Sequence, residues 1–277
     1  MSSSHVLHSP HSPAPQLVEF DTEPFYLPIA DEVDVFAAAA KSNLAVMVKG
    51  PTGCGKTRFV QHMAWRLKRP LVTVVCHDDL NSADLLGRYL IVGDETVWMD
   101  GPLTAAVRAG AICYLDEWIE ARQDTTVVIH PLTDSRRALP LDKRGEYVEA
   151  EADFMLSISC NPARQSLLKE IKPSTRQRFV ALEFDYPEAA VEARIVSHEG
   201  GVDYQTAKKL VKLGALTRQM KGAGLDEGAG TRLLVHAAQL HASGLSPIVA
   251  CTAAIARPLA DEADLRATLD DLIRAVF

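Results

Sequence analysis

Short runs of consecutive apolar residues alternate with amphipathic segments between about residues 44 and 185. The runs are rich in Val, Ile, Leu and Phe and lack the strict polar alternation of a strand with one wet face. This pattern is typical of strands buried on both faces of a parallel sheet that lies between helices. Five strands are therefore expected, at residues 44–49, 71–76, 111–116, 154–160 and 179–185, in an α/β domain.

The pattern becomes helical after the dipeptide at residues 186–187. Helices are expected at residues 188–199, 204–221, 231–243, 246–256 and 264–276, with glycines between several of them. The chain is thus predicted to have a flexible tail at 1–20, an α/β domain at 21–187 and a helical domain at 188–277. The tail is rich in Ser, Pro and His, which is typical of a segment without a packed core.

Composition narrows the class of protein. The chain has 277 residues, of which 47% are hydrophobic and 23% charged, as in an ordinary globular protein. The net charge of −7 gives no sign of a nucleic-acid binder, and no apolar run is long enough to cross a bilayer. The five cysteines are scattered without a CxxC, which is typical of reduced thiols. We expect a cytoplasmic protein that binds neither nucleic acid nor membrane.

A glycine-rich octapeptide, GPTGCGKT, follows the first predicted strand and precedes a helical pattern. It matches GxxxxGK[ST], a phosphate-binding loop whose backbone N–H groups surround phosphate oxygens at a helix start. Lys56 is expected to reach the β- and γ-phosphates of ATP, and the Thr57 hydroxyl to ligate Mg²⁺. The predicted nucleotide-binding residues are Gly50, Pro51, Thr52, Gly53, Cys54, Gly55, Lys56 and Thr57.

The third predicted strand ends in two carboxylates, Asp116 and Glu117. After a phosphate-binding loop, such a pair is expected to supply Asp116 as a Mg²⁺ ligand through water and Glu117 as the group that polarises the attacking water. The simpler interpretation is a strand that ends in surface acids. The pair, together with the lack of a guanine-reading NKxD, favours ATP hydrolysis over a GTPase switch.

Three further polar residues follow in the order that such a site requires. Asn161, directly after the next strand, is expected to orient water near the γ-phosphate, although a turn-forming Asn before Pro is common. Arg178, preferred to Arg176, precedes the last strand as a candidate arginine finger for a neighbouring subunit. Arg232 opens a helix for which Thr231 is a plausible N-cap, and is expected to reach the γ-phosphate. Solvated arginines are the alternative for both positions.

Together these motifs resemble Walker A, Walker B, sensor 1, arginine finger and sensor 2 of an AAA+ ATPase. The resemblance implies a P-loop core with a C-terminal helical lid. The words SADLLG and GPL around residues 82–103 resemble the MoxR branch, with hairpin inserts near 89–99 and 137–149. The tips of these hairpins are charged, and neither hairpin is expected to belong to the core. EARQDTTVVIHPLTDSRR and LKEIKPSTRQRFVALEFDYP resemble the CbbQ/NorQ group, and CbbQ most.

The resemblance implies a function as well as a fold. CbbQ proteins are hexameric ATPase motors of a rubisco activase that acts with a partner bearing a von Willebrand A domain. Such a motor would release inhibitory sugar phosphates from rubisco, with carboxysome association open. The NorQ sister group implies the alternative, an assembly or metal-insertion chaperone for nitric oxide reductase. A small-molecule kinase is disfavoured, because the chain offers arginines acting in trans instead of an acceptor site. Arg122 is either a contact to a neighbouring subunit or a helix-surface charge.

Overall fold

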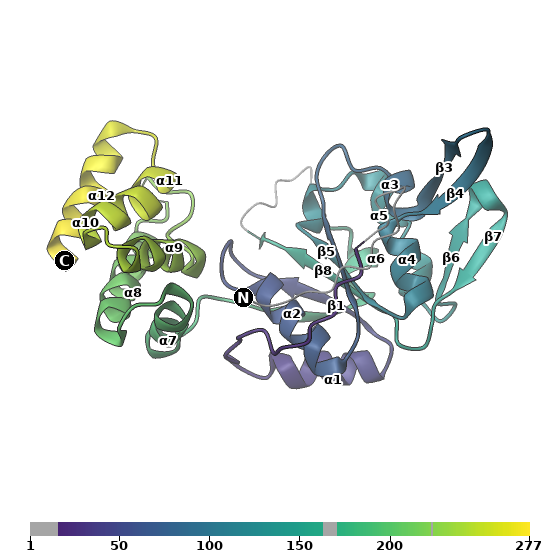
Figure 1. Cartoon of the computed structure of the whole chain (residues 1–277), viewed down its shortest axis with the longest axis horizontal. Coiled ribbons are helices and arrows are strands. Elements are labelled where there is room, and N and C mark those ends of the chain that lie inside the picture. The colour runs from purple at the N-terminus through teal and green to yellow at the C-terminus, as the bar shows by residue number, and fades with distance from the viewer. Residues whose placement is uncertain (1–15, 163–170, 223) are drawn as a thin grey trace. The chain divides into compact units, whose positions relative to one another are not determined.

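The computed structural model describes residues 16–162, 171–222 and 224–277 (Figure 1). Most of the predicted tail therefore lies outside the described residues. The chain forms two compact units. The first contains the residues up to Gly50 and Lys56–Glu183, and the second contains Pro51–Gly55 and Phe184–Phe277.

The first unit is built on a five-stranded parallel sheet, as the sequence predicts. Its strand order is β2-β5-β8-β1-β9, so the strand before the phosphate loop, β1, is central. β1 and β5 are buried except at the last residue and β8 throughout, whereas the edge strands β2 and β9 expose alternate residues. The strands are β1 Ala45–Lys49, β2 Leu71–Val75, β5 Ile112–Asp116, β8 Met155–Cys160 and β9 Phe179–Glu183.

Helices connect and cover the strands of this sheet (Figure 1). α1 and α2 pack against each other through the edge-to-face rings of Phe36 and Phe59, whose centroids are 5.4 Å apart. α4 packs on β2 and β5, and Leu103, Ala106 and Val107 on this helix are fully buried. The helices of this unit are α1 Glu32–Lys41, α2 Lys56–Leu67, α3 Ser82–Leu86, α4 Pro102–Ala109, α5 Gln123–Val127 and α6 Pro173–Arg176.

Two antiparallel hairpins extend from one end of the first unit (Figure 1). β3 Gly87–Val92 pairs with β4 Glu95–Asp100, and β6 Ala138–Leu141 pairs with β7 Glu146–Glu149. The expectation that neither hairpin belongs to the core is wrong for the second. Its strands alternate with period two, so Leu139, Leu141 and Val148 lie in the main core while Tyr147 points to solvent.

The second unit is helical apart from its short phosphate-loop segment, and it has its own apolar core. The predicted helix at 246–256 begins with α10 but continues through a π-helical turn at Thr252–Ala256 into α11. The helices are α7 Ala189–Gly200, α8 Tyr204–Gln219, α9 Thr231–Ala242, α10 Pro247–Cys251, α11 Arg257–Leu259 and α12 Ala263–Val276. Within the described residues, no helix combines the length and the apolar character that a membrane span requires.

Candidate functional site

The phosphate loop connects β1 to α2 in the manner that a nucleotide-binding motif requires. Gly50 begins the loop, and its N–H donates to the Cys160 carbonyl of β8 at 3.1 Å, which anchors the loop to the sheet. Gly53 and Gly55 have φ angles of +74° and +102°, a region that favours glycine. With this backbone the loop brings its N–H groups to the start of α2, where the helix dipole favours an anion.

Lys56 and Thr57 begin α2, and both side chains are held by groups of the first unit. Lys56 Nζ donates to the Gly50 carbonyl at 2.8 Å, so the ammonium folds back along the loop. Thr57 Oγ1 donates to Asp116 Oδ2 at 3.1 Å. A hydroxyl and a carboxylate oxygen this close together are the hard donors that Mg²⁺ prefers, so the two residues fit that ion. The described residues hold no cluster of three or more His, Cys, Asp or Glu side chains around a metal position.

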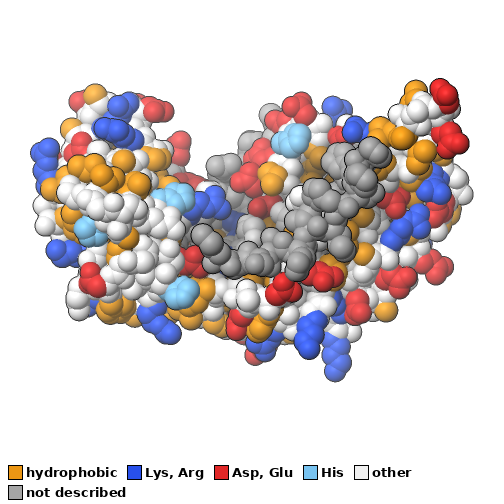
Figure 2. Space-filling view, viewed as in Figure 1, with side chains coloured by type: hydrophobic (Ala, Val, Ile, Leu, Met, Phe, Trp, Pro, Cys, Tyr) orange, Lys and Arg blue, Asp and Glu red, His pale blue; other side chains and the backbone are white. Residues whose placement is uncertain are grey.

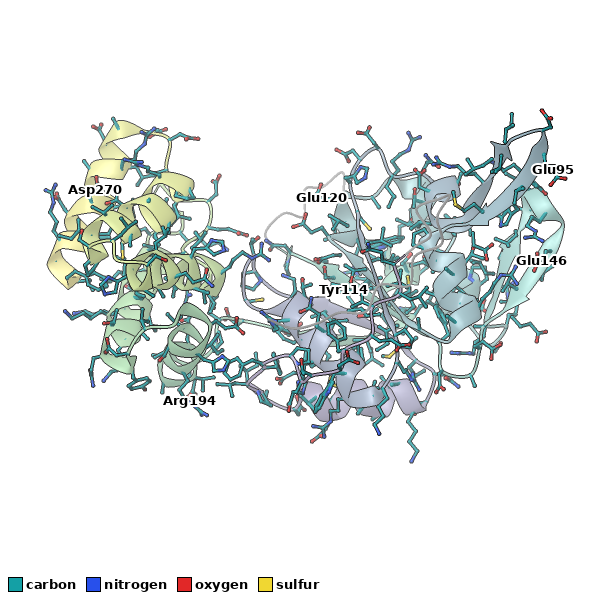
Figure 3. All side chains as sticks on the ribbon, in the orientation of Figure 1. Glu95, Tyr114, Glu120, Glu146, Arg194 and Asp270 are labelled. Carbon is teal, nitrogen blue, oxygen red and sulfur yellow. The ribbon has the colours of Figure 1, made fainter. Side chains whose placement is uncertain are left out.

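The acidic pair lies at the end of β5, where Asp116 is half-buried and Glu117 is exposed. Tyr114, fully buried at the centre of the unit (Figure 3), donates its hydroxyl to Asp116 Oδ1 at 2.9 Å. Burial raises the pKa of Tyr114, and the charge of Asp116 raises it further, so the phenol stays a neutral donor. Glu117 has φ 55° and ψ 40°, a left-handed conformation that is uncommon for a residue with a side chain.

Asn161 directly follows β8, which lies between β5 and β1 in the sheet. Carboxyl ends of parallel strands meet at one edge, so the fold brings Gly50, Asp116 and Asn161 to the same edge. This is the place where ligands bind in open α/β sheets. Their roles toward a nucleotide remain predictions, but the sheet order supports their grouping.

Arg178 lies near Asp134 and His130. Its Nη1 lies 3.8 Å from Asp134 Oδ2 and 3.5 Å from the carbonyl of His130, and its side chain is one-third exposed. Its buried Nε has no hydrogen-bond partner among the described residues. Arg176, at the end of α6, is exposed. Both arginines thus remain candidates for action on a neighbouring subunit, and Arg122 is exposed as well.

In the second unit, the start of α9 lies against the phosphate loop residues that belong to that unit. A Cβ on Gly230 would lie 2.6 Å from the Thr52 carbonyl, so only glycine permits this approach. A Cβ on Gly53 would lie 3.4 Å from Arg232 Cβ. Arg232 therefore lies beside Gly53 of the loop, and its role toward the γ-phosphate stays a prediction.

Thr231 is not the N-cap that the sequence suggested. Gly230 is the N-cap, in extended conformation, and Thr231 is the first residue of α9. The Thr231 hydroxyl donates instead to Glu192 Oε1 at 2.6 Å. Thr231 cannot cap the helix because its own backbone is already helical, and its hydroxyl instead makes a charge-assisted hydrogen bond to a buried carboxylate.

Sequence analysis missed the buried ion pair that surrounds this helix start. Glu192 on α7 is only 1% exposed and accepts from Arg218 Nη1 at 2.9 Å and Nη2 at 2.6 Å. Arg218 Nε also donates to the Ala229 carbonyl at 2.9 Å. A signal for this ion pair was present in the sequence, because Glu192 lies four residues before Val196 and so on the apolar face of a predicted helix. Both residues are buried in the structure, and a buried acid needs a partner.

The same arginine reaches toward the phosphate loop through an aromatic ring. The Arg218 guanidinium lies 3.7 Å from the ring centroid of Tyr186, a cation–π contact. Tyr186 in turn donates its hydroxyl to the Thr52 carbonyl at 3.2 Å. Burial raises the pKa of Tyr186 to about 12, so this hydroxyl keeps its proton at neutral pH.

Comparisons with known proteins agree with this geometry. A sequence model of the AAA domain (dynein-related subfamily) matches residues 45–179, and one of the CbbQ/NirQ/NorQ C-terminal region matches residues 192–276. The protein CbbQ of Hydrogenophilus thermoluteolus is 56% identical over 92% of this chain and 96% of its own. The protein NorQ of Paracoccus denitrificans is 59% identical over 92% of this chain and 94% of its own.

Solved structures share the fold at much lower identity. A RuvB mutant of Thermotoga maritima superposes with a TM-score of 0.53 at 12% identity, and the match covers 88% of this chain and 69% of RuvB. At that identity the similarity concerns the fold alone.

Proposed function

The chain belongs to the CbbQ/NirQ/NorQ family of AAA+ ATPases, and we propose that it is the motor of a rubisco activase. The family makes it a nucleotide-binding ATPase. The proposal adds that it forms a hexameric ring in the cytoplasm, acts with a partner bearing a von Willebrand A domain, and releases inhibitory sugar phosphates from rubisco. The resemblance to CbbQ supports these additions.

In the proposed cycle, the loop N–H groups and Lys56 hold the ATP phosphates. Mg²⁺, when bound by Thr57 and by Asp116 through water, neutralises phosphate charge. Glu117 accepts a proton from the attacking water, which gains nucleophilicity as it loses that proton. Asn161 orients the water near the γ-phosphate. These are the groups that the parallel sheet gathers at one edge.

Two arginines complete the proposed site. Arg232 contacts the γ-phosphate from the second unit, and Arg178 acts on the nucleotide of a neighbouring subunit. An arginine that acts in trans makes hydrolysis depend on ring assembly. Arg178 lies near Asp134 and the His130 carbonyl and stays one-third exposed, which is compatible with that role.

The observation that carries the motor proposal is a continuous connection from the acidic pair to the hairpins. β5, which ends at Asp116, packs against α4. Arg108 at the end of α4 binds both hairpins, with Nε 3.1 Å from Asp100 Oδ2 and Nη2 2.6 Å from Glu146 Oε1. A shift of β5 on hydrolysis would therefore move both hairpins through one helix.

The hairpins also contact each other directly. Arg144 lies 5.6 Å from the ring centroid of Trp98, and the Tyr89 hydroxyl donates to the Lys143 carbonyl at 3.5 Å. Glu95 and Glu146 mark the two hairpins in Figure 3. Contacts of this kind let the two hairpins act as one element.

Both hairpins expose apolar side chains that the fold does not use. Ile91 is 81% exposed and Tyr147 is 77% exposed. Figure 2 shows hydrophobic side chains at the surface of this end of the unit, with acidic ones at the tip. Exposed apolar groups beside charge are typical of a surface that meets another protein, and support force transmission to a partner or target.

A NorQ-like chaperone for nitric oxide reductase is the second candidate. The similarity to the relatives named CbbQ and NorQ is nearly equal, and the site residues serve either target. The two candidates share the ATPase and differ only in the enzyme that the ring remodels.

The deciding experiment is a reactivation assay. Inhibitor-blocked rubisco is incubated with the protein, ATP, Mg²⁺ and the von Willebrand A partner, and carboxylation is followed. Recovery that needs ATP and the partner is the expected result. Failure to reactivate rubisco, combined with ATP-dependent activation of nitric oxide reductase in the parallel assay, would establish the second candidate instead.

The hairpin connection is tested with a matched pair of neighbouring residues. Arg144→Ala removes the contacts to Trp98 and Glu146. Lys143→Ala changes only an exposed side chain, because the contact of Lys143 to Tyr89 is made by its backbone carbonyl. Both variants should keep basal ATPase within about twofold, since surface charges contribute about 1 kcal/mol or less. Only Arg144→Ala should lower partner-dependent activation. A parallel fall of both activities in this variant would show that the hairpin supports the fold and not transmission.

A further inference from the structure

The Ser159 side chain connects the two acidic residues at the end of β5. Ser159 lies on β8, where it is paired with Val48 of β1, and it is fully buried. Its Oγ forms a short hydrogen bond with Asp116 Oδ1 and accepts the backbone N–H of Glu117 at 2.9 Å. Since an N–H can only donate, the serine proton must point to Asp116. The Ser159 hydroxyl thus donates one hydrogen bond and accepts another at the same time.

The first bond fixes the rotation of the Asp116 carboxylate. Oδ1 accepts from Ser159, from the Tyr114 hydroxyl at 2.9 Å and from the Glu117 N–H at 3.1 Å. Oδ2 accepts from Thr57 at 3.1 Å. These hydrogen bonds to Oδ1 thus come from β5, β8 and the Glu117 backbone. Oδ2 faces Thr57, which is proposed to bind Mg²⁺ together with Asp116.

The second bond stabilises the unusual backbone of Glu117. A left-handed conformation is disfavoured for any residue with a Cβ, and persists only where its surroundings impose it. Here the Glu117 N–H is satisfied by Ser159 and by Asp116 Oδ1. The direction in which the Glu117 side chain leaves the strand therefore depends on the serine hydroxyl.

We propose that Ser159 is a positioning residue for ATP hydrolysis, which holds the Asp116 carboxylate and the Glu117 backbone in their working orientation. This inference rests on the roles proposed above for Asp116 and Glu117. Ser159 precedes Asn161 by two residues, so one strand end supplies both the proposed water-orienting amide and the group that orients the acidic pair. Both would respond together to any shift of β8.

The same strand provides a matched control. Ser157 lies two residues earlier, on the same face of β8, and is equally buried. Its Oγ has no hydrogen-bond partner among the described residues. Ser157→Ala and Ser159→Ala thus delete the same atom from equally buried positions on one face of β8, and only the second removes hydrogen bonds to the acidic pair.

The experiment compares steady-state ATPase and nucleotide binding in the full chain. Ser159→Ala should lower kcat about tenfold or more and change KM by less than about threefold, because binding groups of the loop are untouched. Ser157→Ala should keep both within about twofold. Ser159→Thr, which retains the hydroxyl, should recover most of the lost kcat.

Binding of a fluorescent ATP analogue supplies a second measurement that does not depend on turnover. In EDTA, Ser159→Ala and wild type should bind equally, while the gain in affinity on adding Mg²⁺ should shrink in the variant. Equal kcat losses in both serine variants, or a normal kcat in Ser159→Ala, would overturn the proposal. If Ser159→Ala does not fold, Ser159→Thr takes its place in the test. A Ser159→Thr protein that binds the nucleotide like wild type but has a kcat far below that of wild type would also overturn the proposal.

A Glu117→Gln variant separates this inference from the proposed function. Full turnover in Glu117→Gln would show that the assigned role of that carboxylate is wrong. An inactive Glu117→Gln protein beside a fully active Ser159→Ala protein would leave the function standing and remove only the positioning role of Ser159.

Discussion

The buried ion pair in the second unit should control the stability of that unit. Glu192→Ala deletes a carboxylate that accepts three hydrogen bonds, two from Arg218 and one from Thr231. The Arg218 guanidinium then loses its counter-charge, and the Thr231 hydroxyl loses its acceptor. Removing one partner of a buried pair costs about 3–5 kcal/mol. Because the Arg218 side chain is 18% exposed and water can reach part of it, we expect the lower end, about 3 kcal/mol.

Hydrogen exchange measured by mass spectrometry is the appropriate assay, since it reports the second unit separately from the sheet. Peptides from α7, α8 and α9 should lose about 3 kcal/mol of opening free energy in Glu192→Ala, while peptides from β1, β5 and β8 keep their protection. In calorimetry, the transition of a unit of this size should fall by roughly 12 °C or more. Glu188→Ala is the control, because this acid is exposed, precedes the same helix and makes no capping hydrogen bond.

A double variant tests whether the loss belongs to the pair. Adding Arg218→Met to Glu192→Ala should cost less than Arg218→Met costs alone, because the uncompensated charge is removed. Two findings would refute the reasoning. One is additive loss in the double variant, and the other is a Glu192→Ala protein no less stable than Glu188→Ala.

Three further outcomes follow from the site. Lys56→Ala should abolish ATP binding, whereas Glu117→Gln should bind ATP and fail to turn it over; equal loss of affinity in both would contradict their roles. Mixing Arg178→Ala with Glu117→Gln subunits should restore part of the ATPase activity, because some junctions regain both groups; normal turnover by Arg178→Ala alone would direct attention to Arg176. Burial, and then the charge of Arg178, lower the pKa of His130, so the folded state disfavours its protonation. The stability contribution of neutral His130 is therefore full above about pH 6.5 and falls as the pH drops below it. Urea unfolding of wild type and His130→Gln across pH should show a difference in stability that is constant above that pH and changes below it.

The main elements of the fold could be predicted because each depends on a short stretch of sequence. Strands buried on both faces are apolar at every position, and the phosphate loop has a fixed spacing. The carboxyl ends of parallel strands then bring Gly50, Asp116 and Asn161 to one edge whatever the side chains between them. Even so, the strands begin or end a residue or two inside the predicted runs, which is the usual uncertainty of element ends.

Two hydrogen-bond partners, one of Asp116 and one of Glu192, could not be predicted, because they lie far away along the chain. Ser159 is 43 residues from Asp116, and Glu192 is 26 residues from Arg218. Nothing in the local pattern distinguishes Ser159 from Ser157, although one makes two hydrogen bonds and the other none with described residues. Thr231 was misassigned for a similar reason, since its acceptor comes from another helix.

The hydrogen-bond networks around Asp116 and Glu192 share one physical feature. Each surrounds a carboxylate, half-buried in Asp116 and buried in Glu192, with hydrogen-bond donors from several elements, so that its orientation is fixed. Catalysis by preorganised groups needs no rearrangement at the moment of reaction, and fixed groups act more strongly in a medium of low dielectric constant. In the first unit, the role proposed for Asp116 would benefit in this way, because Ser159 and Tyr114 hold its carboxylate. In the second unit, Glu192 holds the start of the helix that carries Arg232 through its bond to Thr231. In each unit, a carboxylate is thus held in one orientation by hydrogen bonds from residues of that same unit.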